Sequence, residues 1–145
     1  MQKICALITL LLLPTLAQAF TGKFSGQGMA HYSTGRNYQC SEIFLHLKIS
    51  EQELRLHEGG YICGFLQAGF DQFKIDIRAG QLWHQDQLLG TITEDQITYQ
   101  IYDPSDNSTY YFSLIKKPQS LHYFEEWHDG EKIALKVEGE LIKRD

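Results

Sequence analysis

The segment Cys40–Cys63, CSEIFLHLKISEQELRLHEGGYIC, is the part of the sequence that decides the expected fold. It contains two runs in which apolar and polar residues alternate, Ile43–Ile49 and Gln52–Cys63. Within the second run, Glu58-Gly59-Gly60 predicts a turn that separates two short strands. A period of two is typical of β-strands that bury one face. A cysteine stands at each end of the segment. We therefore predict a β-meander closed by a disulfide between Cys40 and Cys63, which would close a loop of 24 residues.

The first nineteen residues have the pattern of a secretory signal peptide. A short basic start precedes an apolar run, Ile4–Leu16, and residues 17–19 form a small-x-small cleavage site. We expect residues 1–19 to be removed, so that the mature chain begins at Phe20 and Cys5 is lost. The two remaining cysteines would then pair, because exported proteins fold in an oxidising compartment. The predicted location is periplasmic or secreted.

Short alternating segments and turns continue to the C-terminus, and apolar residues hardly ever recur with the spacing of an amphipathic helix. Examples are Phe73–Arg78, Ile97–Ile101 and Ile133–Leu141. Nine or ten strands joined by such short connections must pair antiparallel, because parallel pairs need long crossovers. Closing the sheet removes its exposed edges. We predict an all-β fold in which residues 20–145 form a single antiparallel up-and-down β-barrel, with a two-sheet β-sandwich as the alternative.

The succession of strands is similar to that of lipocalins and fatty-acid-binding proteins. This lipocalin-like resemblance is limited to the strand pattern, because Gly22-Lys23-Phe24 carries phenylalanine where the lipocalin signature carries tryptophan. Two glycines on the core face of the same first strand, Gly26 and Gly28, predict a bend or the close approach of another strand.

The charge and hydropathy of the chain argue against two classes of partner, nucleic acids and membranes. The formal net charge is −5 and no cluster of lysine and arginine occurs, which argues against nucleic acid and against an anionic membrane surface. After the signal peptide no segment is apolar and long enough for a membrane helix. Strands of about seven residues are also shorter than the ~9–11 residues that a membrane-spanning strand needs. We expect no membrane insertion, and an outer-membrane barrel is the less favoured alternative.

Catalytic, metal and cofactor sites are not predicted. The six histidines occur singly, without the spacing of metal ligands on one strand face. Ser113 and Lys116 match a Ser-x-x-Lys pattern, but on an expected strand that runs into a turn. No serine or cysteine has an identifiable base, and no second inward carboxylate is evident. We expect a protein that is not an enzyme and needs no cofactor.

One carboxylate is expected inside the barrel. Glu125 falls on the same face of its strand as Tyr123 and Trp127, whereas Glu126 faces outward. A carboxylate in an aromatic interior is costly unless hydrogen bonds compensate it. The alternative is a solvated position at the barrel rim, or a bulge that turns Glu125 outward. Tyrosines from other strands are the candidate donors: Tyr32, Tyr99 and Tyr111.

Two functions are compatible with these features. The first is an exported barrel that binds a small apolar or amphipathic ligand in its interior, because aromatic walls with few polar groups form such sites. The second is a protein-interaction or inhibitor module whose barrel is filled by its own side chains. The predicted ligand-binding residues are Tyr99, Tyr123, Glu125 and Trp127. The second function would use the loop Asp103–Ser108 and three aromatic residues expected on the outer face: Tyr110, Phe112 and Phe124.

Overall fold

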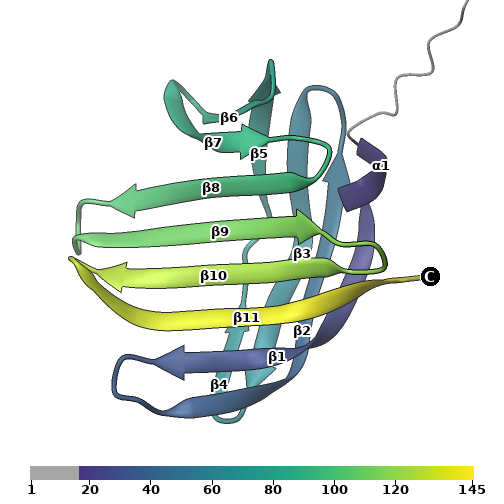
Figure 1. Cartoon of the computed structure of the whole chain (residues 1–145). Coiled ribbons are helices and arrows are strands. Elements are labelled where there is room, and N and C mark those ends of the chain that lie inside the picture. The colour runs from purple at the N-terminus through teal and green to yellow at the C-terminus, as the bar shows by residue number, and fades with distance from the viewer. Residues whose placement is uncertain (1–16) are drawn as a thin grey trace, which may run out of the picture.

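Strands make up most of residues 17–145, the part of the chain that the computed structural model describes (Figure 1). Most of the predicted signal peptide lies outside these residues. A single helical turn, α1 (Ala17–Phe20), comes first, and its Phe20 is fully buried. The strands are β1 (Gly22–Tyr32), β2 (Asn37–Ile49), β3 (Glu53–Cys63), β4 (Leu66–Gly69), β5 (Phe73–Arg78), β6 (Gln81–His84), β7 (Gln87–Ile92), β8 (Gln96–Asp103), β9 (Ser108–Lys116), β10 (Leu121–Asp129) and β11 (Lys132–Arg144).

Ten of these strands form a closed antiparallel barrel in which successive strands are neighbours. The order is β1-β2-β3-β5-β6-β7-β8-β9-β10-β11, and β11 pairs again with β1. β4 lies outside this circle and pairs with β3. The predicted up-and-down barrel is therefore confirmed, and the sandwich alternative is wrong. Within residues 17–145 no helix is long and apolar enough to cross a membrane.

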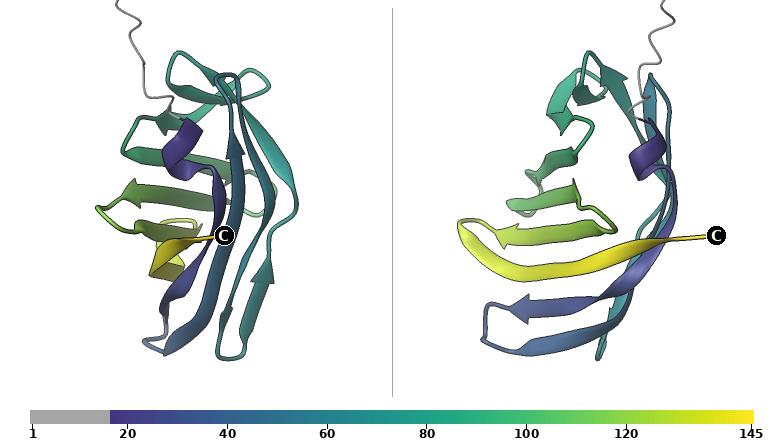
Figure 2. Two further views of the ribbon diagram at one scale, coloured as in Figure 1. Left: turned by 90° about the vertical axis from the view of Figure 1, so that its right-hand side faces the viewer. Right: turned by 45° about the vertical axis from the view of Figure 1, so that its right-hand side comes forward.

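The barrel consists of two curved halves that face each other. In Figure 1, β8 to β11 run side by side, whereas β3 and β5 cross behind them, and Figure 2 shows the same halves from the side. β1 and β2 bend from one half into the other. Glycine permits the tight contact on this path, since a Cβ at Gly26 would lie 1.8 Å from the backbone oxygen of Glu140 on β11. The expected close approach at Gly26 and Gly28 is confirmed.

The disulfide between Cys40 and Cys63 is present and joins β2 to β3. The two cysteines are directly opposite each other in the strand pairing, and both are fully buried. This confirms the predicted pairing.

The course of β3 differs from the expectation. The sequence Glu58-Gly59-Gly60 suggested a turn, but β3 runs unbroken from Glu53 to Cys63. A bulge at His57 shifts the register, since His46 pairs with Glu58 and Leu47 with Leu56. The actual turn is at Gly64, whose φ of +63° favours glycine. Several strands are also longer than the expected seven residues: β3 has 11, and β2 and β11 each have 13.

Candidate functional site

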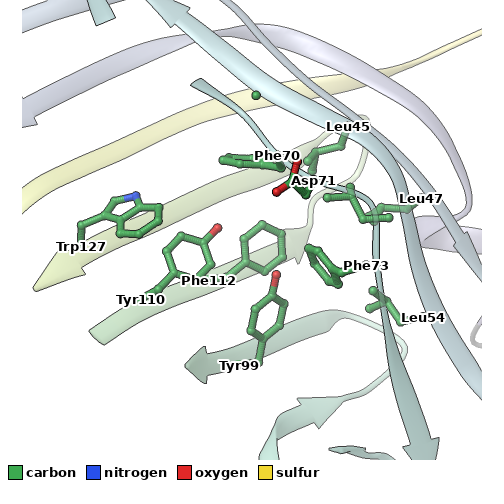
Figure 3. A pocket seen from close by; sticks show the side chains of 12 residues that line it. Leu45, Leu47, Leu54, Phe70, Asp71, Phe73, Tyr99, Tyr110, Phe112 and Trp127 are labelled. Atoms are coloured by element: carbon green, nitrogen blue, oxygen red, sulfur yellow. The ribbon is translucent and has the colours of Figure 1, made fainter. Parts of the chain in front are cut away.

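A cavity of about 290 Å³ lies between the two halves of the barrel (Figure 3). One wall is aliphatic and comes from the inward faces of β2 and β3. Its side chains are almost completely buried, and they alternate with outward-facing residues that are polar except for Phe44. The period of two therefore places every second residue of these strands in the interior, and four of these inward residues are leucines that line the cavity. These leucines are Leu45, Leu47, Leu54 and Leu56.

The facing wall is aromatic. The rings of Tyr99 on β8 and Phe112 on β9 stack with their centroids 4.8 Å apart. The ring of Tyr110 on β9 lies 4.6 Å from that of Trp127 on β10. Phe73 on β5 meets Tyr99 edge to face, with centroids 6.3 Å apart. Such contacts fix the ring orientations, so the wall is preorganised.

The cavity reaches the surface beside the connection between β4 and β5. This connection carries Phe70 and Asp71, and both line the cavity (Figure 3). Asp71 is exposed, and Trp127 on the opposite wall is 39% exposed. The mouth is therefore formed by one carboxylate and several aromatic rings, whereas the interior is apolar.

Behind the aromatic wall, Glu125 accepts three hydrogen bonds although its side chain has 0% exposure. The hydroxyls of Tyr110 and Tyr123 donate to Oε2 at 2.9 and 2.7 Å, and the indole Nε1 of Trp127 donates to Oε1 at 3.2 Å. Tyr123 and Trp127 lie two residues before and after Glu125 on β10, so they share its inward face. Tyr110 comes from the adjacent strand. This donor set is suited to an ionised carboxylate, because an indole N–H can only donate.

Burial has the largest effect on the pKa values of Glu125 and Tyr99. It raises the pKa of Glu125, while hydrogen bonds from Tyr123, Tyr110 and Trp127 act in the opposite direction. Burial, together with the neighbouring Glu125 carboxylate, also raises the pKa of Tyr99. Tyr99 therefore keeps its proton and can donate a hydrogen bond. Figure 3 shows its hydroxyl directed toward Phe112 and Phe73, into the cavity.

The raised pKa of Glu125 predicts how stability depends on pH. A carboxyl that binds its proton more tightly in the folded state stabilises the fold below its unfolded pKa, and this contribution is lost as pH rises through the folded pKa. We therefore expect wild type to lose stability relative to Glu125→Gln between about pH 4, the ordinary range of a glutamate, and neutral pH. Urea unfolding of both proteins across this range measures the difference. A difference that stays constant, or that grows in favour of wild type, would contradict the prediction.

The four predicted ligand-binding residues lie in two layers. Tyr99 and Trp127 line the cavity directly. Tyr123 and Glu125 are fully buried behind the wall and are not among the described lining residues. The suggested rim position of Glu125 is wrong.

The expected donors to Glu125 and the expected outer aromatic residues need correction. Of the candidate tyrosines, none of Tyr32, Tyr99 and Tyr111 donates to Glu125 within residues 17–145; the tyrosine donors are Tyr110 and Tyr123. Tyr110 and Phe112 were also expected to face outward, but they line the cavity. The cause is the run Tyr110-Tyr111-Phe112. Because all three residues are aromatic, apolar character cannot indicate which of them faces inward.

Sequence reasoning did not identify the aliphatic wall or the mouth as parts of a site. The inward direction of Leu45 and Leu47 was predictable from alternation, but their distance from β8 and β9 depends on barrel closure. Phe70 and Asp71 lie in a connection without periodicity, and no pattern marked them.

The histidines make local contacts. His122 Nδ1 lies 2.6 Å from a Glu140 carboxylate oxygen, and His128 Nε2 lies 2.7 Å from one of Glu126. Within the described part of the chain, no three histidine, cysteine or acidic side chains converge as a metal site. Comparison with protein-family models and with curated proteins finds no match for this chain.

Proposed function

We propose that the protein is an exported, non-enzymatic carrier that holds a small apolar or amphipathic ligand inside its barrel. The cavity of about 290 Å³ is the observation that carries this proposal. Its volume is near the lower limit of the ~300–1,000 Å³ typical of small-molecule sites. An aliphatic wall and an aromatic wall face each other across it, and Tyr99 supplies one hydroxyl group. A compact hydrophobic molecule with one polar group matches this lining.

The cavity also favours a carrier over an interaction module with a filled barrel. A small barrel can be filled by its own side chains, and such a core leaves no space of this size. The aromatic residues assigned to the outer face in that alternative, Tyr110 and Phe112, belong to the cavity wall.

Export and solubility are part of the proposal. A disulfide is typical of proteins that fold in an oxidising compartment. The outward positions on β2 are largely polar, as Glu42, His46 and Lys48 illustrate, and this supports a barrel whose outer face contacts water. The signal-like pattern of residues 1–19 supports the same location.

Filling the cavity should abolish binding of a neutral apolar probe. Leu47 lines the cavity, so Leu47→Trp places an indole in the space that a ligand would occupy. We expect affinity for the neutral dye N-phenylnaphthylamine to fall at least about tenfold, equivalent to about 1.4 kcal/mol. Fluorescence titration of the purified mature protein measures this. Lys48→Trp is the matched control, because Lys48 is the next residue on β2 and faces solvent.

Truncating the opposite wall provides a second variant if Leu47→Trp proves unstable. Trp127→Ala removes a ring that lines the cavity and should also weaken dye binding. If both variants are folded and bind the dye as tightly as wild type, the cavity is not the binding site. If wild type does not bind apolar probes at all, the proposed carrier function is wrong.

A further inference from the structure

The charges around the cavity determine which ligands it can accept. Glu125 lies directly behind the wall, and its oxygens accept hydrogen bonds from two wall residues, Tyr110 and Trp127. None of the ion pairs formed by residues 17–145 involves Glu125. Hydrogen bonds offset part of the cost of burying a carboxylate, and a positive charge nearby offsets more of it. The residues around Glu125 therefore supply hydrogen bonds but no positive charge.

The mouth adds a second negative charge. Asp71 is the only charged residue among the described residues that line the cavity, and no lysine, arginine or histidine lines it. Phe70 is next to Asp71, and the rings of Tyr110 and Trp127 belong to the opposite wall (Figure 3). Aromatic faces attract organic cations through their quadrupoles, most strongly where water is excluded. The mouth therefore combines a carboxylate with three aromatic rings around an otherwise apolar cavity.

From this arrangement we infer that the ligand is a hydrophobic organic cation, such as an amine or a quaternary ammonium compound with an apolar tail. The inference rests on the proposed function of the cavity and names its ligand class. The cationic group lies between Asp71 and the rings of Tyr110 and Trp127, near the charge of Glu125. The tail lies against the aliphatic wall, where Leu47 and Leu54 are located.

The same charges exclude anionic ligands such as fatty acids. A ligand carboxylate would face Asp71 at the mouth and Glu125 behind the wall, without a basic residue in the lining to balance it. Like charges at such a site raise the free energy of binding and provide specificity. The formal net charge of −5 acts in the same direction, because it attracts cations over longer distances.

Three ligands with one chain length test the inference. Decyltrimethylammonium, decanol and decanoate share the same tail and differ in the charge of the head group. Each is titrated below its micellar concentration against the complex of the mature protein with N-phenylnaphthylamine, at neutral pH. We expect the cation to displace the dye at concentrations at least about tenfold lower than decanol. Decanoate should be the weakest, and added salt should reduce the preference for the cation.

Single substitutions connect the preference to the two carboxylates. Asp71→Asn removes a negative charge and Glu125→Gln removes an ionisable carboxyl group, each with little change of shape, and each should reduce the preference for the cation over decanol several-fold. Asp86→Asn is the matched control, because Asp86 is exposed in the turn between β6 and β7 and is not a lining residue. It removes the same charge and should leave the preference unchanged. Asp71→Asn also tests the inference independently of any loss of stability in Glu125→Gln.

The outcomes separate this inference from the proposed function. If the dye and decanol bind but the cation has no advantage, or if decanoate binds best, the inference is wrong and the carrier function stands. An equal loss of preference in Asp86→Asn and Asp71→Asn would also overturn it, since only the overall charge would then matter. If neither the dye nor any of the three ligands binds, the proposed function itself fails.

Discussion

Glu125→Ala is expected to lower the free energy of unfolding by about 3–5 kcal/mol at neutral pH. The substitution leaves the hydroxyls of Tyr110 and Tyr123 and the indole N–H of Trp127 without their acceptor. Each buried donor that loses its partner costs about 1–3 kcal/mol, and the space left by the side chain adds to this cost. Equilibrium unfolding in urea, followed by fluorescence and circular dichroism, measures the change.

Two controls separate the hydrogen bonds from the charge. Glu125→Gln keeps the volume and one amide oxygen, so its cost should be about 1–2 kcal/mol. Glu126→Ala removes the next carboxylate on β10, which faces outward and pairs with His128. A partly exposed pair contributes about 0–1 kcal/mol. If Glu125→Ala proved no more destabilising than Glu126→Ala, Glu125 would not organise the aromatic wall.

Reducing the disulfide is expected to lower the free energy of unfolding by about 3–4 kcal/mol, from the entropy of closing a loop of this length. The bond between Cys40 and Cys63 closes a loop of 24 residues that contains the tight β2–β3 connection. A small domain has a net stability of only ~5–15 kcal/mol, so this is a large share. Urea unfolding with and without a reductant measures the effect.

The double variant Cys40→Ala/Cys63→Ala checks the origin of this stabilisation. Both cysteines are buried, so the variant also loses packing and should be at least as unstable as the reduced protein. If reduction left stability unchanged, the bond would not constrain the unfolded chain, and the β2–β3 pairing would depend on hydrogen bonds and packing alone.

Local alternation predicted most of the barrel and two of the residues that line the cavity, Tyr99 and Trp127. The inward faces of β2 and β10 follow directly from their period of two, which also placed Glu125, Tyr123 and Trp127 on one face. The disulfide followed from having two cysteines after the predicted signal. These features depend on residues close in sequence, so pattern alone identifies them.

The features that were predicted wrongly or missed have identifiable physical causes. At Gly59-Gly60 the preference of glycine for turns suggested a break, but the bulge at His57 and the pairing with β2 keep the strand continuous. In the run 110–112 an all-aromatic sequence removed the contrast on which alternation depends. The cavity itself arises because barrel closure places β2 and β3 opposite β8 to β10. The separation between these two walls depends on the whole barrel, so the sequence of a single strand does not reveal it.

Native mass spectrometry of the mature protein, isolated from the cells that produce it, tests most directly whether the barrel carries a ligand. The predicted result is a species heavier than the polypeptide, whose added mass disappears on denaturation and is recovered as a small hydrophobic molecule in the organic extract. Preparations that always show the bare mass, reduced only by the hydrogens lost in the disulfide, together with no binding of apolar probes, would contradict a carrier function.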